Sequence, residues 1–451
     1  MRHGCRGATS PELDVVGAAM RGIVINFFLL VLLPLSLTYP YFGVLAYNWF
    51  TYLNPHRLAY GMGAAIPWAK LIVAALVFSA LASREKTRIQ VNGITALLAM
   101  LLGWTTISTL FAVHPDRAWG DLGDFAKVII AALIASAMIT DRKRLHAFVW
   151  IMVIATAYWT VKGGIYTSLL HGKGHVIGPP HSFFPESNRF ARVAIMAVPL
   201  MLYLAFHSRQ RYVRMAMAAS AFFTVLSLIG TGSRGGFVGF AAMMAWGWLF
   251  SRRKAVLLVA AVSLGAVGYL LMPNERLDSY KARLETIETG DSSINNRFKA
   301  WNYALEVARH SPLVGNGFGA FMDNYVITSK SGYLEAHSNY FQYIGEHGWP
   351  GLIIYLMLGV AVLLRASSVV RRTRGHPQLY WARDLALCIQ LSMIGYFVGG
   401  LVENTAYFEF FYTLIGMLLA TDSIVTRQIS ELSPARDFRR RRRASLPAAA
   451  T

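Results

Sequence analysis

The segment HSNYFQYIGEHGWPGLIIYLMLGVAVLL, residues 337–364, contains a border between polar and apolar sequence. Its first part is polar and aromatic and closes the polar segment 273–347, whereas its second part, 352–364, is an uninterrupted apolar run. Such a run can carry a helix into a bilayer. We therefore expect His337 to stand at a membrane surface, at the mouth of a membrane-spanning helix.

The composition of the whole chain is that of a membrane protein. Of its 451 residues, 55% are hydrophobic and 15% are charged, and the mean hydropathy is +0.42. Several uncharged runs are long enough to cross the roughly 30 Å hydrocarbon core as helices, and the short alternating segments of a transmembrane barrel are absent. The sequence therefore predicts an all-α polytopic integral membrane protein.

The net charge of +20 is concentrated in segments that alternate with the others along the chain. Positive charge on alternate loops is what the positive-inside rule produces, so we place these segments in the cytoplasm. We expect the run RRRRR at 439–443 to meet anionic lipid and not nucleic acid. The segments that hold most of the 43 Lys and Arg residues are 1–21, 83–90, 141–146, 207–214, 251–254, 365–384 and 422–451.

Charge and hydropathy together predict about twelve spans, with both ends of the chain in the cytoplasm. Residues 22–272, after the cytoplasmic N-terminus 1–21, hold spans 1–9 or 1–10, because Pro34 and Pro40 leave 22–50 as one bent span or a hairpin. The last three spans fall in 348–425, before a basic tail at 426–451. The expected spans are 22–50, 64–82, 92–111, 122–140, 145–163, 190–206, 213–230, 235–250, 255–272, 348–364, 385–402 and 408–421.

Two of the expected periplasmic loops are long. The smaller is 164–189, and the larger is 273–347. Within the larger loop, NERLDSYKARLETIE and INNRFKAWNYALEVARH have helical apolar spacing, and SPLVGNGFGAF is typical of a glycine-rich turn. We expect one large helical periplasmic loop.

No cofactor or metal is expected. Cys5 and Cys388 are the only cysteines, which excludes a disulfide framework and a thiolate metal site. His171, His175 and His181 are spaced four and six apart among glycines and prolines, which is not a familiar ligand pattern.

Four arginines next to apolar spans are candidates for binding a phosphate group. Arg189, Arg192, Arg234 and Arg297 all fall on the predicted outer side, and a guanidinium offers paired donors and a permanent charge. Each has a structural alternative. Arg189 and Arg192 could snorkel, Arg234 could order its loop, and Arg297 could pair with Glu288 or Asp291.

His337 is the candidate base or acceptor-positioning group, since a neutral imidazole can accept a proton near neutral pH. Ser338, Tyr340 and Glu335 are its candidate partners in substrate binding. Each has a structural alternative. His337 could be a hydrogen-bonded interfacial histidine, Glu335 a solvated loop carboxylate, and Tyr340 part of an aromatic belt at the membrane boundary.

The spacing around His337 resembles that of bacterial O-antigen ligases. His337 and Ser338 precede nine residues and then Gly348 and Gly351. The segments 188–192, 233–235 and 312–319 and the pair Arg297 and Trp301 extend the resemblance to the O-antigen ligase and polymerase superfamily over about residues 180–410. The first half, including LNPHR at 53–57, is similar to ligase-like proteins of exosortase systems, which are thought to glycosylate proteins.

This resemblance implies a twelve-span fold of the GT-C type in the bacterial inner membrane, with its active site facing the periplasm. It implies transfer of a glycan from undecaprenyl diphosphate to an acceptor hydroxyl, with inversion and without metal. The acceptor would be lipid A-core, in lipopolysaccharide synthesis, or a protein.

The resemblance also implies roles for single residues. Arg234 and Arg297 would bind the diphosphate and stabilise its developing charge, Arg192 and secondarily Arg189 would assist, and His337 would orient or deprotonate the acceptor hydroxyl. No aspartate stands in an obvious base position.

Two other activities remain open at this point. An O-antigen polymerase needs the same phosphate cluster, although the single large loop favours a ligase. A transporter or flippase for lipid-linked sugars would bind the donor without chemistry, but the two similar halves typical of many transporters are not apparent.

Overall fold

The computed structural model describes residues 26–27, 29–55, 66, 68–83, 89–170, 175–180, 182–251, 254–255, 265, 292–322 and 335–444. All secondary structure within these residues is helical, as the sequence predicts. The principal helices are α2 Pro40–Leu53, α4 Trp68–Ala82, α5 Gly93–Leu110, α6 Pro115–Met138, α7 Arg142–Leu169, α8 Ser187–His207, α9 Arg211–Thr231, α10 Arg234–Phe250, α13 Ser292–His310, α15 Asn339–Thr373, α16 Tyr380–Gly399 and α17 Glu409–Ala444.

Several helices are suited to crossing a membrane by length and composition. Among the described residues six meet this condition: Gly93–Leu110, Arg142–Leu169, Ser187–His207, Arg211–Thr231, Asn339–Thr373 and Glu409–Leu432. Shorter apolar helices lie at Leu29–Thr38 and Trp68–Ala82. The chain is thus a multi-pass helical membrane protein, while the total of twelve spans stays a prediction. The N-terminus 1–21 and nearly all of the expected span 255–272 lie outside the described residues.

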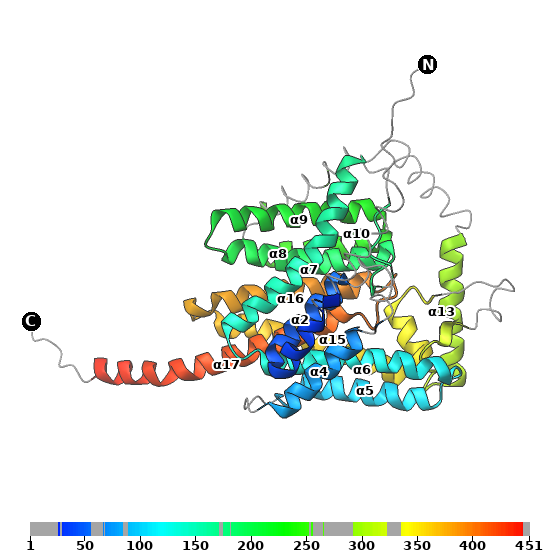
Figure 1. Ribbon diagram of the computed structural model, residues 1–451, viewed down its shortest axis with the longest axis horizontal. Helices are drawn as coiled ribbons and strands as arrows, with labels where there is room; N and C mark the ends of the chain where they lie inside the picture. The colour runs from blue at the N-terminus through cyan, green and yellow to red at the C-terminus, as the bar shows by residue number, and fades with distance from the viewer. Residues whose placement is uncertain are drawn as a thin grey trace, which may run out of the picture.

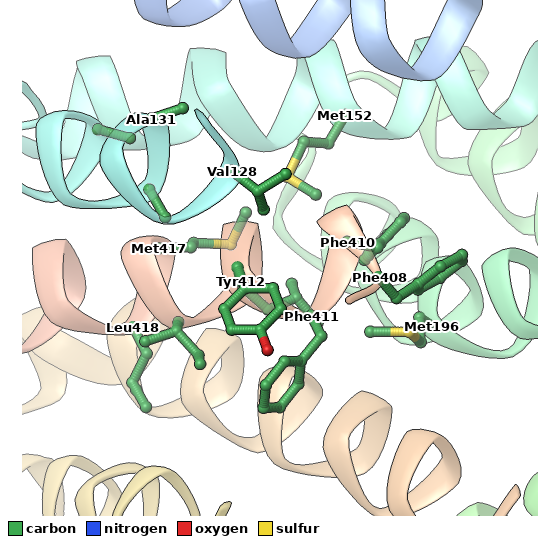
Figure 2. Close-up of a cluster of buried hydrophobic side chains, with 14 of the residues drawn as sticks. Val128, Ala131, Met152, Met196, Phe408, Phe410, Phe411, Tyr412, Met417 and Leu418 are labelled. Atoms are coloured by element: carbon green, nitrogen blue, oxygen red, sulfur yellow. The ribbon is translucent and has the colours of Figure 1, made fainter. Parts of the chain in front are cut away.

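Most helices run side by side, whereas α13 lies across one end of the bundle in Figure 1. Helix α17 supplies much of the core: Phe410, Tyr412 and Met417 are fully buried in the main hydrophobic cluster. Figure 2 shows these side chains between residues of α6, α7 and α8. The first turns of α17 are therefore fixed by packing, and so is the short segment that connects α16 to it.

Helix α15 begins at Asn339, nine residues earlier than the expected span 348–364. Hydropathy misses this start because 339–347 is polar, yet most of these side chains are buried inside the protein. The helix kinks at Gly348, whose φ of 66° and ψ of −170° lie in a region that only glycine adopts readily. The signature HSNYFQYIGEHGWPG therefore forms a buried helical turn and a kink, so the large loop ends earlier than expected.

Other boundaries differ from the expected ones in ways that local chemistry explains. Helices 29–38 and 40–53 meet at Tyr39, because Pro40 lacks an N–H group and starts a new helix. Helix α7 continues to Leu169, beyond the expected end at 163, which shortens the smaller loop. Helix α13 confirms the expected second helix of the large loop. The expected first helix, NERLDSYKARLETIE, lies outside the described residues.

Gly348→Ala is expected to destabilise the protein by about 1–3 kcal/mol, because alanine is strained at this φ and ψ. Its Cβ would also meet the carbonyl oxygens of Leu313 and Pro312. The measurement is the midpoint of thermal unfolding in detergent. Gly103→Ala is the matched control, since a Cβ on this helical glycine meets nothing within 4 Å. An unchanged midpoint for Gly348→Ala would show that the kink is not a constraint.

Candidate active site

The first turns of α8 carry Arg192 into the interior. Arg192 is 1% exposed, and its guanidinium donates to Gly395 O at 2.9 Å and to Tyr396 O at 3.4 Å. Gly399 lets it approach, because a Cβ there would overlap the guanidinium. A charge buried this deeply needs partners or a ligand. The snorkelling alternative is wrong for Arg192, whose side chain is turned inward.

Arg189, one turn earlier, forms an ion pair with a candidate from the large loop. Its Nη2 lies 2.9 Å from Glu335 Oε1, and its Nε lies 3.9 Å from Glu186 Oε2. The side chains of Arg189 and Glu335 are 25% and 12% exposed, so water screens this pair only partly. The pair joins the start of α8 to the segment just before His337.

His337 has a backbone conformation that is uncommon for a residue with a side chain, with φ of 45°. Helix α13 holds this segment: Trp301 Nε1 donates to Ala336 O at 3.0 Å, and the Trp301 ring stacks on Phe341 with centroids 4.9 Å apart. Burial lowers the pKa of His337, and the charge of Arg297, a residue of α13, lowers it further. The imidazole is therefore neutral at neutral pH, as the sequence predicts for a base or an acceptor-positioning group.

Asn339 joins this segment to the connection between α16 and α17. Its backbone N–H donates to Gly400 O at 2.8 Å, and its Oδ1 accepts from Thr405 N at 2.6 Å and from Thr405 Oγ1 at 3.2 Å. Its Nδ2 donates to Tyr355 OH at 3.2 Å. Asn339 thereby holds both ends of the segment 400–405 against the start of α15.

Glu403, within that segment, is a site residue that the sequence analysis missed. It is 2% exposed, and burial raises its pKa to about 7 against the lowering influence of Arg192, Arg297 and Arg189. Glu403 is the one charged residue in the short segment 400–408 between two apolar spans. A carboxylate there is expensive to bury, and this is the signal that could have identified it. The charges that act on Glu403 show that three of the four candidate arginines converge here.

Glu335, His337 and Glu403 come together at one point. One ligand atom from each lies within 4.8 Å of the others. Glu335 Oε2, His337 Nδ1 and Glu403 Oε1 are all buried, with no hydrogen-bond partner among the described residues. Carboxylate and imidazole groups could hold a divalent cation, and they could equally accept hydrogen bonds from substrate hydroxyls.

The remaining candidates lie on elements that adjoin this centre. Arg234 is exposed at the first position of α10, and its neighbour Gly235 packs against Val402, next to Glu403. Ser338 is the N-cap residue of α15, and its buried Oγ has no partner among the described residues. Tyr340 OH donates to Phe397 O at 2.9 Å, so this hydroxyl joins α15 to α16.

A second polar network, also missed from sequence, fixes the kink of α15 and the glycine-rich turn. Tyr407 OH bonds to Glu346 Oε2 and lies 2.7 Å from His347 Nε2, while His347 Nδ1 lies 2.9 Å from Ser108 Oγ on α5. Glu346 Oε1 accepts from Gly319 N at 3.2 Å. This chain of bonds joins α5, the turn, α15 and the segment before α17.

Comparison with known protein families gives a match that contains most of this site. Residues 219–356, which include Arg234, Arg297 and His337, match a family described as O-antigen ligase. The match supports assigning this part of the chain to the O-antigen ligase family. The resemblance predicted from the His337 signature is therefore confirmed. The O-antigen ligase family handles glycans at the membrane, with a lipid-linked glycan and an acceptor as its substrates.

The O-antigen ligase match leaves out two parts of the site. Arg189 and Arg192 fall in residues 20–209, which match a family of unknown function, and Glu403 lies beyond both matches. No curated protein matches the chain. The likeness of the first half to ligase-like proteins of exosortase systems stays a prediction.

Asn339→Ala is expected to cost about 1–3 kcal/mol of stability, since it leaves the buried Thr405 N–H without an acceptor. Thermal unfolding in detergent measures the loss. Asn302→Ala, which removes an exposed asparagine of α13, is the control and should not change the midpoint. Equal midpoints for the two variants would contradict the role given to Asn339.

Proposed function

We propose that this protein is an O-antigen ligase that transfers a glycan from undecaprenyl diphosphate to a hydroxyl of lipid A-core, with inversion at the anomeric carbon. The observation that supports this most directly is the convergence of arginine charge with His337 on one buried centre. The proposal places the reaction at the periplasmic face of the bacterial inner membrane, with both chain termini in the cytoplasm and a GT-C-type arrangement of spans.

The arginines supply the donor half of this mechanism. Arg297 and Arg234 would bind the diphosphate, and Arg192 and Arg189 would add positive charge beside it. Because charge grows on the diphosphate as the glycosidic bond breaks, guanidinium groups fixed in a water-poor site stabilise the transition state more than the ground state. We propose that this charge replaces a metal ion, so that transfer needs no metal.

His337 supplies the acceptor half. Its neutral imidazole would orient or deprotonate the attacking hydroxyl, with Glu335, Ser338 and Tyr340 lining the acceptor site. A lipid diphosphate is already a good leaving group, so alignment and charge stabilisation can provide most of the rate acceleration. The acceptor hydroxyl then attacks from the side opposite the leaving diphosphate, which gives inversion.

The test is transfer from glycan-linked undecaprenyl diphosphate to purified lipid A-core by the detergent-solubilised protein, with EDTA present. His337→Ala and Arg297→Ala are expected to lose about 100-fold or more of the rate, as for removal of one stabilising donor. His310→Ala and Arg309→Ala are the matched controls on α13, since these side chains are 75% and 77% exposed. The controls should transfer at the wild-type rate.

Three other outcomes would redirect the proposal. Transfer to a periplasmic protein but not to lipid would make the enzyme a protein glycosylation ligase, and joining of donor units to each other would make it a polymerase. Movement of intact donor across vesicles, unaffected by His337→Ala, would show a transporter and refute the enzyme.

A further inference from the structure

The structure points to Glu403 as the base of the transfer reaction, and we infer that its Oε1 takes the proton of the acceptor hydroxyl while His337 holds that hydroxyl in line. This inference rests on the proposed function. Glu403 provides the carboxylate base that is missing near His337 in the sequence, and it comes from a segment more than 60 residues further along the chain.

The geometry around Glu403 calls for a hydrogen-bond donor that the described residues do not supply. Three potential acceptor atoms face one another within 4.8 Å, on Glu403, His337 and Glu335. Glu403 itself is 2% exposed, and its Oε1 has no partner among the described residues. Buried acceptors are nearly always satisfied, and each one left without a donor destabilises the folded protein. A sugar hydroxyl entering this space provides the missing donor.

Glu403 suits the role of base better than Glu335 does. Glu335 Oε1 accepts a hydrogen bond from Arg189 Nη2 at 2.9 Å, so this carboxylate is already committed to an ion pair. No ion pair among the described residues includes Glu403, which interacts with Arg192, Arg297 and Arg189 only at longer range. Glu335 instead balances the charge of Arg189 and keeps it in place.

Glu403 also suits the role better than His337 does. Burial shifts the two groups in opposite directions: it raises the pKa of Glu403 to about 7 and lowers the pKa of His337. An added proton neutralises a buried carboxylate, whereas it would create a new cation on His337 beside Arg297 and Arg189. The proton therefore passes to the carboxylate, and the imidazole acts through hydrogen bonding.

The step balances without another reactant. The acceptor oxygen forms a bond to the anomeric carbon of the donor as the bond from that carbon to the diphosphate oxygen breaks. The bonding electron pair leaves with the diphosphate, next to the arginines, and the hydroxyl proton moves to Glu403 Oε1. The carboxylic acid so formed later returns its proton to water.

Glu403→Gln tests this assignment with two nucleophiles. Transfer to a hydroxyl acceptor needs a base, whereas transfer to azide, an anion with no proton to lose, does not. We expect the variant to lose about 100-fold or more of hydroxyl transfer, the range for general base catalysis, and to keep the wild-type rate of glycosyl azide formation. Arg297→Ala should lose both reactions, because it acts on the donor.

The controls separate a base from a structural residue. Glu306→Gln makes the same change at an exposed side chain of α13 and should leave both reactions unaffected. Thermal unfolding and binding of undecaprenyl diphosphate establish that Glu403→Gln is folded and holds the donor. In the wild type, kcat/KM for hydroxyl transfer should fall as the pH drops below about 7, because Glu403 of the donor-free protein then becomes protonated. Azide transfer should lack this decline.

Several results would overturn the inference. Equal loss of hydroxyl and azide transfer in Glu403→Gln would make Glu403 a structural residue, and unchanged hydroxyl transfer would remove it from the reaction. Loss of wild-type activity in EDTA, restored by a divalent cation, would make Glu335, His337 and Glu403 metal ligands. Failure of the wild type to transfer the glycan to any nucleophile would refute the proposed function itself, and the role of Glu403 with it.

Discussion

The hydrogen bonds of Asn339 are the constraint on which the site depends. One side chain and one backbone N–H hold the start of α15 against both Gly400 and Thr405. His337 lies two residues before Asn339, and Glu403 lies between its two partners. The backbone N–H of Asn339 belongs to the first turn of α15, so it has no acceptor within the helix and needs one elsewhere. Gly400 O is that acceptor. The same bonds therefore begin a helix and bring two distant site residues together.

The buried charges of the site are tolerated because separate elements bring opposite charges and polar groups next to them. Arg189 and Arg192 come from α8, Arg297 from α13, and the acidic groups from the loops that precede α15 and α17. Isolated charges would be too costly to bury, but opposite charges and backbone carbonyls around them reduce that cost. Arg192 illustrates this, because its Nη1 donates to Gly395 O and Tyr396 O without losing its charge, while its buried Nε has no partner among the described residues.

Sequence reasoning reached the parts of the site that have a local signal. Arg189, Arg192 and Arg297 stand out as charges near apolar spans, and the spacing from His337 to Gly351 is a pattern within one segment. Glu403 has only a weak signal, a carboxylate between two apolar spans, and the pair Glu346 and Tyr407 has none. The contacts of these residues join segments far apart in sequence. The start of α15 was misplaced for a related reason: its polar first turns are buried in protein, which hydropathy cannot distinguish from exposure to water.

The electrostatics link the two substrates of the proposed reaction. Arg192, Arg297 and Arg189 lower the pKa of Glu403, so in the absence of donor they oppose the effect of burial and weaken it as a base. A bound diphosphate would offset those positive charges, and the basicity of Glu403 would then rise. In the proposed reaction the acceptor hydroxyl would thus be activated most strongly when the donor is in place. If Glu403 is the base, its place within the electrostatic reach of Arg192, Arg297 and Arg189 would favour transfer to the acceptor over proton uptake in the empty site.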